Sequence, residues 1–584
     1  MTISRLSKHN LEKLVFAGIL LLSFFTIVYR ASSIPATQDE VISFFEYVAS
    51  DSSWLLDFRT ANNHLLNTLL GKLFTGLFGM NMFSFRLPNA LAFLVYGLGV
   101  WRISSRLKFE MKWLLILNLM IAYPIIEYFG LARGYGISFA FMILQLDYLL
   151  EYASKGKLVD LFLSTLCLGL AVLANLSLAV HLAVSTGVVI LINILAYQGL
   201  RNWLPLILNV GFILSFGYIG LGLNQSQELY YGYDDGFYRT TIDTLLNMFK
   251  HSTDSIYTNV LLGTILLLTI LSILDSLWSK LRLPDLLVKP KLVLTLAMFL
   301  NIVGTIALSE IIGVNYPSER VGLYFVILFL LTSAFAYNDV NRKSLRIGIF
   351  ITNAILTIGI AAHTLSVFSL ERSRVEPYAH LSEKSFNKIV NLSKADKILP
   401  IVCGDERLSY AYRYLTFVND VQVNPIANSI SSLGCEIEIL FEPESDLEMG
   451  IRVHSDPDNL KELDVYFQHN QDEGSIEFIE EYQTISKIAM LDTGEYILTV
   501  GLDVESGDKP KISLVMSINN GREKQDLLYE AERIDCMLKQ PRCEKERSWK
   551  LKLTEPVHAH FYLFNLESKK ITLNSSNIKV YKLN

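Results

Sequence analysis

The apolar positions of this chain are concentrated between its N-terminus and about residue 368. Apolar runs of roughly 18 to 22 residues recur there, and this is the length that an α-helix needs to cross a bilayer. Beyond this point the chain becomes polar, and short stretches alternate between apolar and polar positions, as in strands with one buried face. The pattern therefore predicts a large helical membrane domain followed by a water-exposed tail.

The apolar runs predict about 11 membrane-spanning helices. We expect the domains to divide at 1–370 for the membrane domain, 371–435 for an α/β connecting segment and 436–584 for a β-sandwich. The predicted spans cover residues 12–30, 85–103, 112–128, 132–152, 158–174, 177–197, 204–223, 257–278, 292–312, 320–338 and 346–368.

Lysine and arginine gather in one set of the loops between these runs, beginning with Arg5 and Lys8. The positive-inside rule then places the N-terminus in the cytoplasm, and an odd number of spans places the tail outside. A cleaved signal peptide is the alternative interpretation of the first run. Its end, Tyr29–Ser33, is a poor cleavage site, which favours an uncleaved span.

The tail carries alternating stretches whose spacing predicts an antiparallel sandwich. Its layout loosely resembles jelly-roll carbohydrate-binding modules, and a docking role for a sugar acceptor and a structural lid are both open. The predicted strands lie within 494–500, 511–517, 549–553, 558–563 and 578–581.

Composition agrees with a membrane protein, because 51% of the residues are hydrophobic and only 18% are charged. No basic stripe or nucleic-acid motif is present, so we expect no nucleic-acid partner. Of the five cysteines, Cys167 lies in a span. The other four, Cys403, Cys435, Cys536 and Cys543, allow two disulfides in the tail, and Cys536 with Cys543 is the easier pair.

Ionisable residues inside or beside spans are costly and usually functional. The acidic pair Asp39 and Glu40 follows the first span directly, and further charged and histidine side chains lie at the outer ends of later spans. We expect one outward-facing polar cavity. Its other candidates are His64, Glu127, Arg133, His181, Glu310 and Arg320.

Each of these residues also has a structural interpretation. Glu127 and Glu310 are equally well explained as interfacial anchors, and His181 is better explained as a hydrogen-bonded packing residue than as a ligand. Arg133 and Arg320 can snorkel to headgroups. However, phosphate groups are bound by arginine forks of this kind.

Five short motifs in the first 370 residues resemble integral-membrane glycosyltransferases of the GT-C fold, in the protein mannosyltransferase and aminoarabinose transferase branch. No proline follows His64, whereas that branch has a His-Pro or Lys-Pro step. The motifs are Thr37–Val41, Asn62–Asn67, Phe85–Ala90, Ala132–Tyr135 and Tyr316–Arg320.

The resemblance implies a polyprenyl-phosphate-linked sugar donor and attack by an acceptor hydroxyl from the outer side, with inversion. Asp39 is the expected general base and Glu40 the second choice. Arg133 and Arg320, with Tyr135 and Tyr316, are expected to bind the donor phosphate. A divalent metal is possible, and Asp234 and Asp235 are weak candidates to hold it, since a solvated acidic turn explains them better.

The leading hypothesis is therefore a sugar transferase of the bacterial cytoplasmic membrane, in contact with membrane lipids. Its acceptor is a protein, a lipid or a polysaccharide, and an ER location is the alternative. Two other classes are open: a transporter or flippase of lipid-linked sugars, and an inactive membrane assembly protein that binds a glycan. A transporter would show repeated halves and polar groups near the bilayer midplane, which the sequence does not.

Overall fold

A computed structural model describes most of the chain. The described residues are 2–50, 60–197, 203–228, 232–249, 255–277, 288–338, 340–376, 381–394, 399–428, 437–440, 450–453, 460–463, 467–469, 475–488, 490–520 and 528–583. The chain forms two compact units. The first comprises Met1–Ile34 and Leu55–Glu371, and the second comprises Pro35–Trp54 and Arg372–Asn584.

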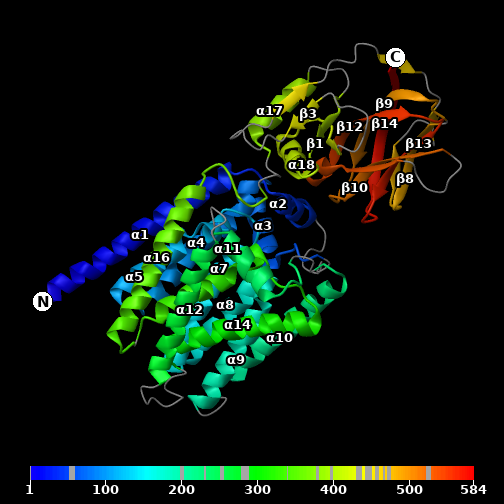
Figure 1. The fold of residues 1–584 in the computed structure, drawn as a ribbon. Coiled ribbons are helices and arrows are strands. Elements are labelled where there is room, and N and C mark those ends of the chain that lie inside the picture. The colour runs from blue at the N-terminus through cyan, green and yellow to red at the C-terminus, as the bar shows by residue number, and fades with distance from the viewer. Residues whose placement is uncertain are drawn as a thin grey trace. The chain divides into compact units, whose positions relative to one another are not determined.

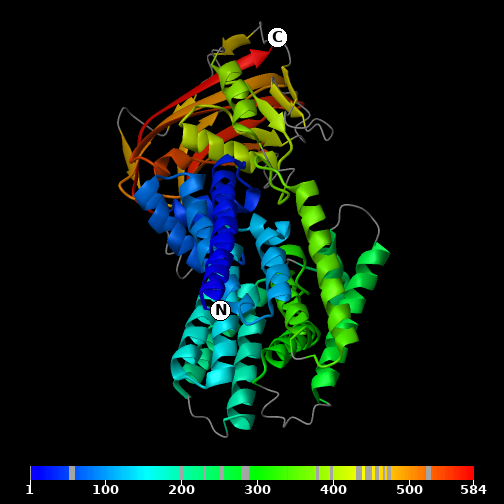
Figure 2. The same cartoon turned by 90° about the vertical axis from the view of Figure 1, so that its left-hand side faces the viewer.

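The first unit is helical, and its helices run alongside one another (Figures 1 and 2). Each predicted span lies largely on helix. Six helices in the described part of the chain are long and apolar enough to cross a membrane, and the number of spans stays a prediction. The long helices are α1 (Thr2–Ser33), α4 (Met82–Ser104), α5 (Phe109–Ile121), α7 (Tyr135–Lys155), α8 (Leu158–Ala174), α9 (Ala179–Leu195), α10 (Trp203–Gln225), α12 (Ser255–Leu277), α14 (Pro290–Ile312), α15 (Glu319–Phe335) and α16 (Lys343–Val367).

Short helices connect or precede several of these long ones. They are α3 (Leu65–Phe78), α6 (Tyr123–Glu127), η2 (Leu176–Leu178), η3 (Tyr238–Asp243) and α11 (Thr244–Asn247). The outer surfaces of the long helices remain apolar: Leu22 of α1 is 72% exposed and Leu214 of α10 is 69% exposed. Exposed apolar surface of this extent fits helices that face lipid.

The predicted span 112–128 is two helices, because the chain breaks between α5 and α6 at Ala122. Pro124 explains the break, since a proline lacks the backbone N–H and its ring would clash with the carbonyl group of the preceding turn. The span predicted from residue 132 begins later, at Tyr135. Arg133 therefore lies in the loop before α7 and not in its first turn.

The second unit begins with α2 (Gln38–Ser43) and the π-helical turn η1 (Phe44–Val48). Its next part is an α/β layer in which α17 (Glu383–Ser393) and α18 (Leu408–Asn419) accompany a sheet of order β2-β1-β3-β4. The strand β1 is parallel to β2 and β3, and β4 is antiparallel to β3. The strands are β1 (Val402–Gly404), β2 (Ile426–Asn428), β3 (Ile437–Leu440) and β4 (Gly450–Val453). The strands of this sheet lie on both sides of residue 435, and the predicted domain division stays a prediction.

Two antiparallel sheets follow, with the orders β11-β10-β13-β8-β6 and β12-β9-β14-β5, and β7 pairs with β14. Their inward side chains, such as Leu498, Leu514 and Phe561, form one buried core. The predicted antiparallel strands are confirmed, and the jelly-roll order stays a prediction. The strands are β5 (Leu460–Leu463), β6 (Phe467–His469), β7 (Ile476–Phe478), β8 (Tyr482–Ile488), β9 (Gly494–Glu505), β10 (Ile512–Asn519), β11 (Leu528–Arg533), β12 (Arg542–Leu553), β13 (His558–Asn565) and β14 (Ile571–Leu583).

The expected disulfide between Cys536 and Cys543 is present, with Cα atoms 5.8 Å apart. Cys536 belongs to the short helix η5 (Asp535–Leu538) and Cys543 to β12, so the bridge closes the turn between them. Cys167 is buried in α8, as expected for a small apolar side chain. Cys435 lies outside the described residues, so the second disulfide that the tail allows stays a prediction.

Candidate functional site

The two adjacent acids at the start of α2 have different surroundings. Glu40 is fully buried and closes a capping box, since its Oε2 accepts from the Thr37 backbone N–H at 3.1 Å and Thr37 Oγ1 accepts from the Glu40 N–H at 3.4 Å. Asp39 is half-buried in the first turn, and its own backbone N–H donates to Glu376 Oε2 at 3.2 Å. Glu40 therefore has a structural role, which the Thr-x-x-Glu spacing signals in the sequence.

The turn that follows Asp39 is held by aromatic contacts within the second unit. The rings of Phe44 and Phe45 lie 5.9 and 5.2 Å from that of Phe417 on α18. The guanidinium carbon of Arg413 lies 4.1 Å from the centroid of the Phe45 ring, within cation–π range. Asp535 receives a bidentate pair of hydrogen bonds from the same guanidinium group, at 2.5 and 2.6 Å.

Ion pairs of Glu46 also hold the same turn. Glu46 pairs with Lys511 at 3.0 Å and with Arg533 at 2.7 Å, and Lys511 is 465 residues away in the sequence. These contacts attach the Asp39 segment to the C-terminal domain. We call the set the clasp; its residues are Phe44, Phe45, Glu46, Arg413, Phe417, Lys511 and Arg533.

Three of the sequence motifs meet in the first unit through buried asparagines. Asn89 of α4 donates to Asn67 Oδ1 of α3 at 2.6 Å, and Asn67 donates to the Ala132 carbonyl oxygen at 3.0 Å. Asn89 Oδ1 in turn accepts from the Ile137 backbone N–H at 3.4 Å. Both asparagines are at most 1% exposed. This asparagine network fixes the loop that carries Arg133 against α3 and α4.

Arg133 and its neighbours lie close together in that loop. The guanidinium group of Arg133, in a side chain that is only 3% exposed, donates to Asn62 Oδ1. His64 Nδ1 lies 3.1 Å from the Ala174 carbonyl oxygen, and its ring meets that of Tyr135 edge-on at 5.4 Å. Gly134 has φ +71°, and a Cβ there would lie 2.3 Å from the Ala174 oxygen. The close packing therefore requires glycine between Arg133 and Tyr135.

Two buried arginines organise the end of α1. Arg86 donates to the carbonyl oxygens of Ala31 at 3.2 Å and Ile34 at 2.7 Å, so it caps the helix end. Arg30 forms a buried ion pair with Glu127 at the end of α6. Glu127 is thus paired inside the helical unit.

The late-loop motif forms a second group in the first unit. The hydroxyl of Tyr316 donates to Glu310 Oε1 at 2.8 Å, and this bond raises the pKa of Tyr316. The backbone of Tyr316 pairs with that of Tyr233 in an isolated bridge. Glu310 is exposed and Arg320 is half-buried in the first turn of α15.

His181 lies in a separate buried network between helices. Its Nε2 is 3.0 Å from Gln145 Oε1 of α7, and its Nδ1 is 3.1 Å from Asn301 Nδ2 of α14. The histidine is fully buried. These contacts match the packing role that the sequence favoured for His181.

Asp234 and Asp235 are exposed in the loop before η3. Within the described residues no group of three His, Cys, Asp or Glu side chains is arranged to hold a metal ion. Of the predicted residues, the structure brings Arg133, His64 and Tyr135 together, and separately Tyr316 and Glu310. Asp39 and Glu40 belong to the other unit.

No family model matches the sequence, and a comparison with curated proteins gives no match. Comparison with solved structures returns ArnT from Cupriavidus metallidurans bound to undecaprenyl phosphate, with 14% identity over 71% of this chain and 89% of that chain, at a TM-score of 0.37. It also returns the oligosaccharyltransferase AglB from Archaeoglobus fulgidus, in complex with an inhibitory peptide and a dolichol-phosphate, with 12% identity over 71% and 60% of the two chains, at 0.36.

A third similar structure is the arabinosyltransferase EmbB from Mycobacterium smegmatis, with 10% identity over 97% of this chain and 64% of that chain, at a TM-score of 0.34. These proteins are glycosyltransferases of the GT-C fold, which is the class that the sequence motifs resemble.

Proposed function

We propose that this protein is a membrane glycosyltransferase that moves a sugar from a polyprenyl-phosphate donor to an acceptor hydroxyl, on the outer face of a bacterial cytoplasmic membrane. The observation that carries the proposal is the asparagine network, because it unites three motifs around the buried guanidinium group of Arg133. Burying an arginine side chain costs desolvation free energy unless its guanidinium group binds an anion or a polar partner. A phosphate is such an anion.

In this mechanism Asp39 accepts the proton of the acceptor hydroxyl, which attacks the anomeric carbon and displaces the lipid phosphate with inversion. The transition state has oxocarbenium character, as in glycoside hydrolysis. Arg133 stabilises the negative charge that develops on the departing phosphate, and Arg320 and Tyr316 assist. His64 and Tyr135, which pack against the same loop, orient the donor.

The assignment of the base separates Asp39 from Glu40 on structural grounds. The carboxylate of Glu40 is buried and accepts hydrogen bonds from Thr37 in the cap of α2. Asp39, one position earlier, is half-buried. A carboxylate that takes part in a cap is poorly placed to accept a proton from a substrate.

Substituting each acid by its amide tests this choice. We expect Asp39→Asn to lower transfer about 10²- to 10⁴-fold, because a general base contributes this much. Glu40→Gln should lower it less than about tenfold, since glutamine also closes a capping box. Mass spectrometry of envelope glycans from a deletion strain that carries each variant gives the readout, and undecaprenyl phosphate binding checks the fold. Near-normal transfer by Asp39→Asn would exclude Asp39 as the base.

A further inference from the structure

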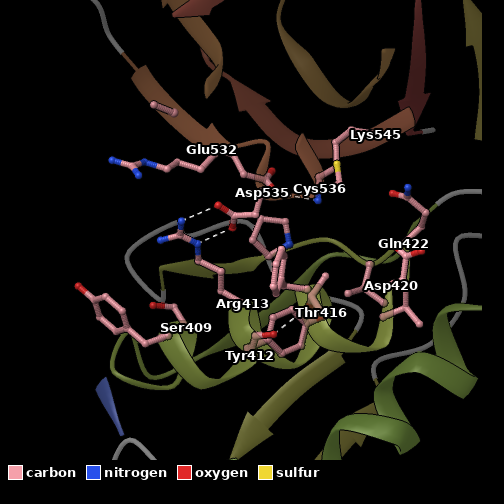
Figure 3. A pocket seen from close by; sticks show the side chains of 17 residues that line it. Ser409, Tyr412, Arg413, Thr416, Asp420, Gln422, Glu532, Asp535, Cys536 and Lys545 are labelled. Atoms are coloured by element: carbon pink, nitrogen blue, oxygen red, sulfur yellow. Dashed lines mark hydrogen bonds and ion pairs between the residues drawn. The ribbon is translucent and has the colours of Figure 1, made fainter. Parts of the chain in front are cut away.

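A pocket of about 310 Å³ lies within the second unit, between α18 and the β11–η5–β12 segment (Figure 3). This volume is at the lower end of the range for small-molecule sites, about 300 to 1,000 Å³. In Figure 3 Thr416 and Asp420 of the α18 side face Glu532 and Lys545 of the strands across the pocket. None of the residues assigned to the transfer reaction lines it.

The charges around the pocket balance. Three cationic and three anionic side chains line it, and within the pocket Arg413 pairs with Asp535 while Lys545 pairs with Glu532 at 3.1 Å. A lining of this kind has no excess charge with which to attract an anion or a cation. It does present donors and acceptors together. The charged residues are Arg413, Arg533 and Lys545, and Asp420, Glu532 and Asp535.

Several polar groups of the lining have unused hydrogen-bonding capacity. Asp420 is exposed, and its carboxylate makes no hydrogen bond with another described residue, although its charge attracts that of Lys539. The hydroxyl of Tyr412 also has no partner in the described part of the chain, but it is buried and not open to a ligand in the pocket. Gln422 uses its amide N–H for the Glu544 carbonyl oxygen at 2.7 Å, which leaves its own oxygen to accept.

Apolar surface lies beside these groups, because Tyr410, Phe417 and Pro425 also line the pocket. A sugar ring has the complementary make-up, with one face of C–H groups and a rim of hydroxyls that donate and accept. Exposed donors and acceptors beside apolar surface suit a ligand that offers both hydroxyls and C–H groups. We propose that this pocket binds an uncharged saccharide.

The position of the pocket gives this ligand a role. Arg413 and Phe417 both line the pocket and belong to the clasp, which holds the turn directly after α2. A bound saccharide therefore contacts the side chains that hold the Asp39 segment. This step rests on the proposed function: the saccharide is then the glycan part of the acceptor, and its binding is linked to the placement of the base.

Binding can be measured without any transfer reaction. The full-length protein in nanodiscs is titrated with maltotetraose, mannotetraose, galactotetraose and arabinotetraose by saturation-transfer NMR, with tetragalacturonate and a neutral tetrapeptide for comparison. We expect at least one neutral oligosaccharide to bind. Asp420→Asn and Tyr410→Ala should each raise its Kd about tenfold or more, as the loss of a hydrogen bond to a charged group or of a ring face predicts.

The variants are chosen to preserve the fold. Asp420 has φ +53°, a conformation that asparagine also tolerates, so Asp420→Asn removes the charge without straining the backbone. Tyr529→Ala and Asp492→Asn, at exposed positions outside the pocket, are the matched controls and should bind like the wild type.

Three results would overturn the proposal. In the first, no neutral oligosaccharide binds, and in the second, the pocket variants bind it as tightly as the controls do. In the third, the pocket variants lose affinity only for tetragalacturonate or for the peptide. Because the readout is binding, such a result leaves the transferase assignment standing. Conversely, normal transfer by Asp39→Asn with intact saccharide binding would remove the assigned base and keep the pocket.

Discussion

The segment that carries Asp39 and the loop that carries Arg133 are held in different ways. The Arg133 loop is fixed by buried hydrogen bonds from asparagine side chains to backbone groups of neighbouring helices. The Asp39 segment is fixed by ring contacts and ion pairs with a domain that follows more than 320 positions later, as the clasp residues from Arg413 onward show. The first is part of the helical unit itself, and the second depends on the C-terminal domain.

The difference has a physical consequence. Buried hydrogen bonds to the backbone leave little freedom, because a broken bond exposes an unsatisfied group in an apolar interior. The aromatic rings of the clasp are also buried, but its ion pairs are partly exposed, and such pairs are individually weaker. We therefore expect changes at the Arg133 loop to be more severe than changes at the clasp.

Among changes that compare the Arg133 loop with the clasp, the largest effect is expected at Arg133 itself. Arg133→Met should lower transfer about 10²- to 10³-fold, as the loss of a group that stabilises developing charge does elsewhere. Arg133→Lys should recover only part of the rate, since lysine keeps the charge but lacks the fork that binds phosphate. Initial rates and undecaprenyl phosphate affinity, measured on the purified protein, give the readout. Equal rates for the arginine and methionine proteins would remove Arg133 from the mechanism.

The next largest effect concerns the stability of the same loop. Gly134→Ala should destabilise the helical unit by about 3 kcal/mol, because alanine is strained at φ +71° and its Cβ would meet the Ala174 carbonyl oxygen. Gly187→Ala is the control: Gly187 lies in α9, and a Cβ there has nothing within 4 Å. This substitution should leave the thermal midpoint unchanged or raise it slightly. Similar midpoints for the two variants in detergent would contradict the assigned strain.

The sequence predicted the parts of this structure that depend on local patterns. Long apolar runs marked the helices, and alternating stretches such as that ending at Val500 marked the strands, because each pattern reports which face is buried. The late start of α7 was missed, although a Gly-x-Gly sequence at Gly134 signals a turn. The break before Pro124 was missed for the same reason, because the apolar run was interpreted as one helix in spite of its proline.

The site was predictable only in part. Arg133 could be recognised from its motif as a residue able to bind phosphate. Asn67 and Asn89 could not, because they are short polar side chains within helices and no local pattern shows that they would be hydrogen-bonded to each other. The pairing of Glu127 with Arg30 was not predicted, because the two residues are 97 positions apart. The clasp could not be predicted either, because Glu46 and Lys511 are even farther apart in the sequence and were assigned to different domains.

The smallest effect is expected at the clasp, where Arg413→Met removes the contact with Phe45 and leaves Asp535 without its bidentate partner. Transfer should fall on the order of tenfold, less than the about 10²-fold that a 1 Å misplacement can cost. Hydrogen exchange of the backbone in α2 and η1 should rise together with this loss. The exchange measurement matters because a purely structural role for Arg413 elsewhere would not alter that segment.

Arg542→Met is the control, because Arg542 forms a similar bidentate pair with Asp503 in the same domain without touching the clasp. This pair is more exposed, so its loss should change neither transfer nor exchange of α2 and η1. If both variants slow transfer equally, the C-terminal domain acts only through its general stability. If only Arg413→Met slows transfer, the C-terminal domain holds the Asp39 segment in its catalytic position. The clasp then contributes to the rate, as the buried hydrogen bonds of the Arg133 loop do.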